Sequence, residues 1–467
     1  MYRKKENLFF YAYEEKAYIV QKAVLPYIRN TGKIRRQALL VIQYFEYPNK
    51  KKEDYYFMMR SLKTKLAYLF FIRPSDIFDK INLKSNEKVI CMKDVKDLLF
   101  NPLYSEDKLN PNFRNIVNEK LPYARNLIKQ WAEGFIDRDY KFVKEFQTTF
   151  NSSFWELYLF AALKELGFDV NFNYDRPDFV VEGKNGFLIE ATIASHAKGG
   201  TPEWQKNYTE AELNEWYKEK IIDNATLRLA NAFIGKSRKY TESYNKLPHV
   251  KGKPYVIAIA PFDSPYFFLQ NHHPIQRVLY GFDRFIAIDW DHQNRDILDM
   301  IYMEEIEKKT GAKVPLGYFT NPDHSHVSAV IFSNAATFSK VRVMSDDPRI
   351  TLVKYRRFND YGTQPLEGVV EKSVFNEHLL DGLVFFHNPY AEIPFDIGEF
   401  LHPVIGHYSF DVANKEFMSD IPHGYLFNRH IFVMDSPGAS PEELRQIRAQ
   451  LNKDNKPNDT VFPKFHK

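Results

Sequence analysis

Three acidic residues in the middle of the chain have the types and the spacing needed to hold a metal ion: Glu156, Asp178 and Glu190. Asp178 and Glu190 flank the dipeptide Asn185-Gly186, which favours a tight hairpin turn because such turns need positive φ at both central positions. The turn would bring the two carboxylates side by side, where they could share a divalent cation. All of these ligand atoms are hard oxygens, so Mg²⁺ is the expected ion, with Mn²⁺ as a substitute.

The surrounding residues predict the elements that position these acids. Apolar residues recur at helical spacing from Leu157 to Leu166, and Gly167 suits the left-handed end of that helix. Phe168 to Tyr174 alternates apolar and polar residues, as a strand with one buried face does. Two more strands are expected, one on each side of the turn, over 176–181 and 187–193. The acids should therefore lie on a helix, at the entry of one strand and within its partner.

Glu190 is the most demanding of the three acids because the strand around it is otherwise apolar. An unpaired charge at such a position would cost several kcal/mol in desolvation. Glu190 therefore needs a metal ion, a basic partner or a solvent-filled cleft.

Each acid also has a purely structural interpretation. Ser153 and Glu156 fit a capping box, in which the glutamate satisfies a free backbone N–H at the start of a helix. Asp178 follows Pro177 and fits a turn. Glu190 could pair with a buried arginine or lysine. Only the combination of the three acids, in this order and spacing, favours a catalytic site.

A helix with a glutamate, a strand, a Pro-Asp strand, a hairpin and a glutamate-bearing strand together resemble the PD-(D/E)XK, or restriction-endonuclease-like, superfamily. The resemblance is specific over 153–260 and implies an α/β fold with a mixed sheet flanked by helices. It also implies metal ligation by Asp178 and Glu190, an accessory role for Glu156, and Mg²⁺-dependent cleavage of phosphodiester bonds. The chain departs from the motif at Thr192, which stands where the family has a lysine that orients the attacking water.

A replacement lysine is expected from a helix downstream. Lys236 continues an apolar stripe between Trp204 and Tyr244, so its stem can lie against the sheet while its ammonium reaches the carboxylates. Arg228 and Lys239 lie nearly in line on an adjacent face and are candidates to hold phosphates. Lys198, in the loop after the Glu190 strand, is a rival for the lysine role.

The composition narrows the class of protein. The chain has 467 residues, 44% of them hydrophobic, and a formal net charge of +4, so nucleic-acid contacts would have to come from local clusters of cations. Cys91 is the only cysteine, which excludes a disulfide framework and a cysteine-rich zinc site. No apolar run approaches the length of a membrane span, and no phosphate-binding glycine loop is visible. A cytoplasmic protein is expected.

The chain divides into three predicted parts. Residues 1–140 are expected to be mainly helical and could bind nucleic acid or a protein partner. Residues 145–400 should form the nuclease-like domain, its sheet extended by apolar runs such as 255–260 and 285–288. Residues 401–467 are expected to be an extension and tail. The cations with which the first part could grip a phosphate backbone include Lys50, Lys51 and Lys52.

The function expected from these patterns is that of a metal-dependent endonuclease, with DNA preferred to RNA as the substrate. By resemblance, such domains act in bacterial defence, mobile elements or repair. The alternative is a catalytically inactive relative that binds nucleic acid or serves as a scaffold. Self-association into a homo-oligomer is compatible with either function.

Overall fold

The computed structural model describes two compact units, residues 1–94 and 95–467. In the first unit it describes the backbone of six strands. In the second it describes residues 95–434 and parts of 442–449, without 119–120, 140, 184–185, 206–220, 266, 290–296 and 362–363; the side chains of 286–289, 297–298, 397 and 399 also lie outside the description.

The described elements of the first unit are strands that form two three-stranded sheets, in the orders β3-β1-β6 and β2-β4-β5. The longest pair is β4 (Tyr55–Ser61) with β5 (Ala67–Ile72). The prediction of helices is therefore wrong for the residues of these strands, and the physical reason is that β4 and β5 are rich in aromatic residues, which favour a pleated surface. Lys50, Lys51 and Lys52 lie outside the described residues. The remaining strands are β1 (Lys16–Ile19), β2 (Ala38–Leu39), β3 (Ile42–Tyr44) and β6 (Ile90–Cys91).

Helices are described from Val95 onward, and these belong to the second unit. They bury aromatic residues in the same core as the long helix α7 (Asn151–Glu165). The unit that carries the acids therefore starts near residue 95 and not near 145. The helices are α3 (Val95–Leu98), α4 (Pro111–Asn118), α5 (Pro122–Trp131) and α6 (Phe142–Thr148).

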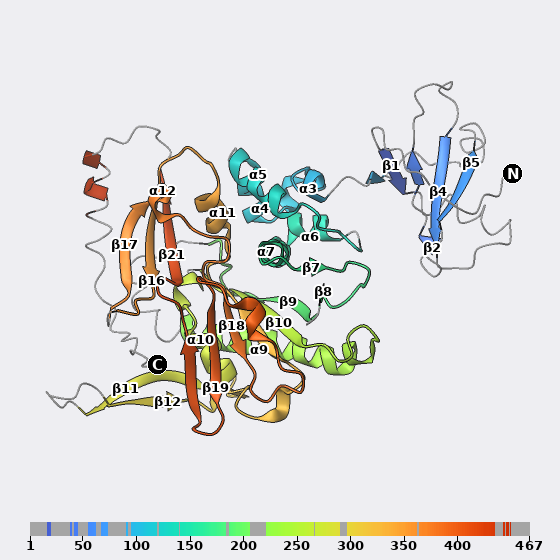
Figure 1. Ribbon diagram of the computed structural model, residues 1–467. Coiled ribbons are helices and arrows are strands. Elements are labelled where there is room, and N and C mark those ends of the chain that lie inside the picture. The colour runs from blue at the N-terminus through green and yellow to red at the C-terminus, as the bar shows by residue number, and fades with distance from the viewer. Residues whose placement is uncertain are drawn as a thin grey trace. The chain divides into compact units, whose positions relative to one another are not determined.

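An eight-stranded mixed sheet organises the second unit, in the order β20-β19-β18-β15-β10-β9-β8-β7 (Figure 1). β10 runs parallel to both of its neighbours, whereas β8 runs antiparallel to β9. The strands are β7 (Asp169–Val170), β8 (Phe179–Glu182), β9 (Leu188–Ser195), β10 (Tyr255–Phe262), β15 (Ala329–Phe332), β18 (Val384–His387), β19 (Gly406–Asp411) and β20 (Glu416–Asp420).

Helices cover both faces of this sheet, and the sequence of β10 shows why. All eight residues of β10 are buried, and they alternate between the two main hydrophobic cores. Val256 and Ala258 belong to the core that contains α7. Ile257 and Ile259 belong to the core shared with α9 (Ile222–Glu242) and α10 (His273–Tyr280). A continuous apolar strand of this kind is stable only with both faces covered.

Two predicted boundaries differ from the structure at the C-terminal side. The stretch 401–467 is not simply an extension, because β19 and β20 complete the main sheet. β21 (Leu426–Val433) pairs with β16 (Thr351–Arg357), which also pairs with β17 (Leu366–Glu371). The apolar run 285–288 lies in β11 (Phe282–Asp289), which pairs only with β12 (Ile297–Tyr302) and does not join the main sheet.

The remaining elements are short. They are the hairpin of β13 (Glu305–Glu307) and β14 (Lys313–Pro315), the helices α11 (Phe338–Met344) and α12 (Lys372–Phe375), and the 3₁₀ turns η1 (Glu106–Lys108), η3 (Tyr244–Lys246), η4 (Phe267–Gln270), η5 (Pro322–His324) and η6 (Ile397–Phe400).

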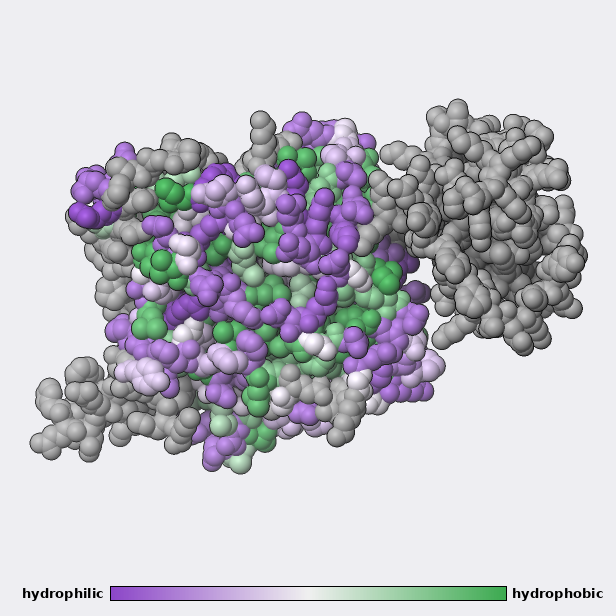
Figure 2. Space-filling model, turned by 45° about the horizontal axis from the view of Figure 1, so that its top comes forward, coloured by the Kyte–Doolittle hydropathy of each residue, from purple (hydrophilic) through white to green (hydrophobic). Residues whose placement is uncertain are grey.

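The surface of the described part is mixed in polarity. On the face that Figure 2 shows, apolar side chains occur as separate patches between polar ones. None of the helices described here is long and apolar enough to cross a membrane.

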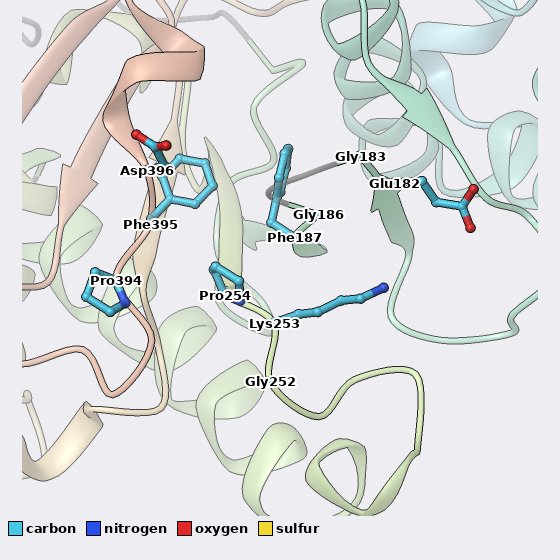
Figure 3. Close-up of a pocket in the computed structure, with 10 residues that line it drawn as sticks. All are labelled: Glu182, Gly183, Gly186, Phe187, Gly252, Lys253, Pro254, Pro394, Phe395 and Asp396. Atoms are coloured by element: carbon cyan, nitrogen blue, oxygen red, sulfur yellow. The ribbon is translucent and has the colours of Figure 1, made fainter.

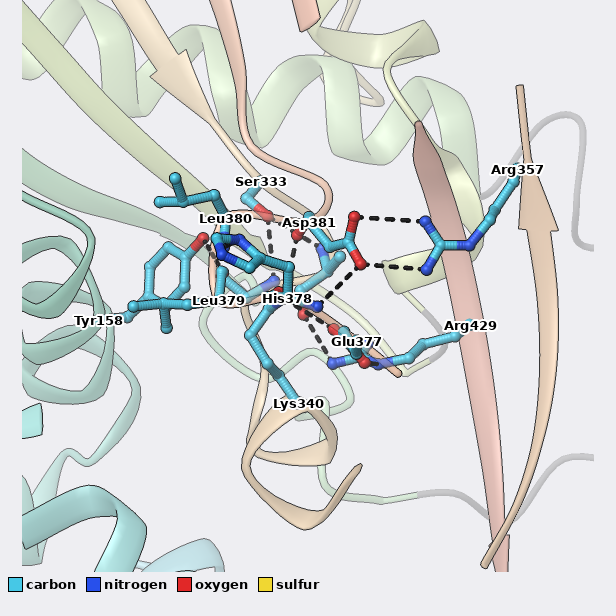
Figure 4. Close-up of polar contacts among 12 residues, drawn as sticks. Tyr158, Ser333, Lys340, Arg357, Glu377, His378, Leu379, Leu380, Asp381 and Arg429 are labelled. Carbon is cyan, nitrogen blue, oxygen red and sulfur yellow. Dashed lines mark hydrogen bonds and ion pairs between the residues drawn. The ribbon is translucent and has the colours of Figure 1, made fainter. Parts of the chain in front are cut away.

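A buried ionic network joins the β17-β16-β21 sheet to α11 and to the segment that leads into β18 (Figure 4). The carboxylate of Glu377 pairs with Lys340 of α11 at 2.7 Å and with Arg429 of β21 at 2.5 Å, and all three side chains are almost completely buried. Asp381 pairs with Arg357 of β16 at 3.0 Å. Because a buried ion is costly without its partner, these residues depend on one another.

We expect Glu377→Gln to lower the free energy of unfolding by roughly 3–5 kcal/mol, because it leaves Lys340 and Arg429 buried without their shared counter-charge. Urea unfolding followed by circular dichroism measures this. The matched control is Glu305→Gln, which removes an exposed ion pair with Lys313 and should leave the midpoint close to wild type. Equal midpoints for the two variants would contradict the prediction.

Candidate active site

The β8–β9 hairpin places Asp178 beside Glu190, as the sequence predicts. Phe179 pairs with Ile189 and Val180 with Leu188, so extending this antiparallel register by one residue puts Asp178 opposite Glu190. The backbone N–H of Ala191 donates a hydrogen bond of 2.8 Å to Asp178 Oδ2, which ties this carboxylate to β9. The turn residue Asn185 lies outside the description.

Glu190 is completely buried, and two lysines of α9 meet it. The ammonium groups of Lys236 and Lys239 lie 2.6 Å and 2.8 Å from the same oxygen, Glu190 Oε1. Leu188, two residues earlier, packs in the core shared with α9, so the alternation of the strand directs Glu190 to that side. The predicted arrival of Lys236 at the carboxylates is confirmed. Lys239, predicted to hold phosphate, is paired with Glu190 instead.

The two lysines decide the charge state of Glu190. Burial alone would raise the pKa of Glu190, but the charges and hydrogen bonds of Lys236 and Lys239 together lower it. Asp178 behaves in the opposite way: burial and the neighbouring Glu190 charge raise its pKa to about 6, against the effect of Lys236. The site thus holds one firmly ionised carboxylate next to one that titrates close to neutrality.

Glu156 belongs to the same electrostatic cluster. Burial and the charge of Asp178 raise its pKa well above the usual range, so its protonated form is favoured. The capping-box interpretation is wrong, because α7 already begins at Asn151 and Ser153 is a buried residue inside the helix. Glu156 therefore lies beyond the first turn, where its carboxyl group is not needed as a cap.

Three residues near the acids escaped the sequence analysis. Arg138 donates hydrogen bonds to the carbonyl oxygens of Tyr174 (2.6 Å) and Pro177 (3.3 Å), and so holds the segment that leads to Asp178. Tyr244, just after α9, and Tyr255 in β10 are buried, and the Glu190 charge adds to burial in raising the pKa of both phenols. The helical spacing from Lys236 through Tyr240 to Tyr244 was the available signal for Tyr244.

Two predicted cations take no part in the carboxylate cluster. The guanidinium of Arg228 donates hydrogen bonds to the carbonyl oxygens of Ser195 (2.6 Å) and His196 (3.3 Å), so it caps the end of β9, and its role in phosphate binding stays a prediction. Lys198 is exposed in the loop after β9. The lysines that reach Glu190 come from α9, because that helix lies across the face to which Glu190 points.

The arrangement suits a hard divalent cation. Asp178 and Glu190 are adjacent carboxylates, and Glu190 Oε2 is buried without a hydrogen-bond partner in the described part of the chain. No group of three or more His, Cys, Asp or Glu side chains that could hold a metal occurs among the residues that the structure covers. Mg²⁺ commonly uses only one or two protein carboxylates and completes its shell with water and substrate phosphate. Asp178 and Glu190 are the residues that would hold it.

Four histidines of the second unit form hydrogen bonds with side chains other than those of the carboxylate cluster. His324 and His326 both hydrogen-bond to Ser237 Oγ of α9, at 3.0 Å and 2.8 Å. His387 and His407 hydrogen-bond to each other at 3.1 Å. Each of these hydrogen bonds joins segments that are distant in sequence. The histidines therefore have a structural role in holding those segments together.

A hollow of about 560 Å³ lies at the other end of the β8–β9 hairpin (Figure 3). Gly183 and Gly186 line it on one side and Phe395 and Asp396 on the other, and Lys253 extends towards Glu182. Because Asp178 and Glu190 lie at the end of the hairpin away from its turn, this hollow is separate from the carboxylate cluster.

No protein-family model, curated protein or solved structure matches the chain. Membership of the restriction-endonuclease-like superfamily therefore stays a prediction.

The raised pKa of Asp178 has a consequence for stability in the absence of metal. A carboxyl group whose pKa is higher in the folded state than in the unfolded chain binds more protons when folded, so its contribution to stability falls as the pH rises from about 4 to about 6. Above that window Asp178→Asn should therefore be more stable than wild type, by about 1–3 kcal/mol, and near pH 4 the two should be similar. Urea unfolding in EDTA at pH 4 and pH 8 measures the difference. A variant that is less stable at pH 8 would contradict the prediction.

Proposed function

We propose that this protein is a metal-dependent nuclease that hydrolyses phosphodiester bonds, with DNA as the preferred substrate. The observation that carries the proposal is the meeting of Lys236, from a separate helix, with the buried carboxylate of Glu190 beside Asp178. A lysine delivered from α9 supplies the charge that Thr192 cannot. The order of α7, β7, β8 and β9 supports a restriction-endonuclease-like arrangement within the mixed sheet.

The side chains have the properties that such a reaction needs. The Lys236 ammonium can donate a hydrogen bond to a water held next to Glu190 and stabilise negative charge as that water loses a proton. Glu156 keeps partial solvent exposure and has a raised pKa, so it can accept or hold a proton at a carboxyl oxygen. When bound by Asp178 and Glu190, Mg²⁺ would polarise the scissile phosphate and lower the pKa of a coordinated water.

A catalytically inactive nucleic-acid-binding relative is the second candidate, and one observation favours it. Lys236 and Lys239 already neutralise Glu190, so the buried charge is compensated without any metal. In this case the protein would bind nucleic acid equally well in Mg²⁺ and in EDTA, and would not cut it.

The test is cleavage of supercoiled plasmid and of labelled single- and double-stranded DNA and RNA, in Mg²⁺, Mn²⁺ or EDTA. We expect metal-dependent cleavage that falls roughly 100-fold or more in Lys236→Met and in Asp178→Asn, because each removes a charge at the reacting centre. The control is Arg238→Gln, which removes an exposed cation of the same helix and should retain activity.

Binding without cleavage in every metal, measured by gel shift on the same substrates, would reject the nuclease and support the inactive relative. Cleavage that survives both Lys236→Met and Asp178→Asn would reject this site as its source.

A further inference from the structure

Two ammonium groups share a single carboxylate oxygen, which is an unusual arrangement for so buried an acid. Lys236 and Lys239 lie within 2.8 Å of Glu190 Oε1, while Glu190 Oε2 has no hydrogen-bond partner in the part of the site that is described. Two positive charges that repel each other therefore crowd one oxygen of Glu190, with the Asp178 carboxylate beside them. A single lysine would be enough to pair with that oxygen, so the position of the second one calls for another explanation.

The two lysines are not equivalent. The side chain of Lys236 is 23% exposed and that of Lys239 is 48% exposed. The Lys239 ammonium also lies 5.0 Å from the centre of the Tyr244 ring, on the ring face. A cation over an aromatic face gains about 0.5–1 kcal/mol, so Lys239 can leave Glu190 without losing all of its stabilisation. Lys239 is therefore the one that can be displaced at low cost.

We propose that Lys239 occupies the cation position at Glu190 and that a divalent ion must displace it in order to bind. This inference rests on the proposed function. Lys239 then acts as an internal competitor that weakens the affinity for the metal, while Lys236 stays at the carboxylate. A doubly charged ion between Asp178 and Glu190 would interact with both carboxylates, whereas the Lys239 ammonium is bound to Glu190 alone.

The consequence for the substrate follows from the exposure of Lys239. Once displaced, its ammonium stands at the solvent side of the carboxylates, where it can pair with a phosphate oxygen. In the metal-free state Lys239 would then pair with Glu190, as observed. In the metal-bound state it would bind phosphate, as the sequence predicts. Metal binding and phosphate binding would be coupled through one side chain.

The experiment is a titration of the full-length protein with Mn²⁺, followed by electron paramagnetic resonance of the free ion. We expect Lys239→Gln to bind Mn²⁺ about tenfold more tightly than wild type, since it removes an ammonium that holds the ligand. Arg238→Gln carries the same change of net charge on the same helix and should bind Mn²⁺ as wild type does. Glu190→Gln should abolish the site.

A second measurement follows the displacement itself. Labelling of lysines with an amine-reactive reagent, read by peptide mass spectrometry, should increase at Lys239 when Mg²⁺ is added, while labelling at Lys236 stays unchanged. Lys253, which lies at the other end of the hairpin, serves as the internal reference.

The two proposals fail in different ways. If wild type binds Mn²⁺ and Glu190→Gln does not, but Lys239→Gln and wild type have equal affinity, the competitor role is rejected and the metal site stands. If Arg238→Gln tightens binding as much as Lys239→Gln does, the effect is one of net charge and the competitor role is also rejected. If wild type binds no Mn²⁺ at Glu190, both the competitor and the metal-dependent nuclease are rejected.

Discussion

The need to compensate a fully buried carboxylate governs the centre of this protein. Glu190 lies within β9 between buried apolar residues, and an isolated charge there would be costly. Its pairing with Lys236 and Lys239 links β9 to α9, and the apolar face of α9 then packs on the same side of the sheet through Leu229 and Phe233. The same two ion pairs thus join the helix to the sheet and set the chemistry of the site.

The ionic cluster at Glu377 and the one at Glu190 differ in their exposure to solvent and in how the cations meet the carboxylate. The side chains of Glu377, Lys340 and Arg429 are almost inaccessible to solvent. Lys340 pairs with one oxygen of the Glu377 carboxylate and Arg429 pairs with the other. That network is suited to hold β21 against α11 and the segment that leads into β18. At Glu190, by contrast, both lysines crowd one oxygen and Lys239 is half-exposed. A cluster with access to solvent is the one that can exchange a partner.

The predictions from sequence were best where local physics decided the outcome. The helix that carries Glu156, its end at Gly167 and the two strands of the hairpin follow from periodicity and turn chemistry, and each was found within a few residues. The predictions were wrong where pairing between residues far apart in the sequence decides the structure. Aromatic residues of β4 and β5 form strands where helices were expected, and the run around Phe285 pairs with β12 outside the main sheet.

The sequence by itself determined that an acidic strand had to be paired with Asp178 across a hairpin, because alternation and register are local properties of neighbouring residues. It also indicated which lysine has the reach to replace the missing motif residue. Only the tertiary structure decided that Lys239 joins Lys236 at the same oxygen, and that the sheet continues to residue 420. Those contacts depend on how a helix lies across a sheet and on which strands pair over long separations, and burial over the whole fold sets both.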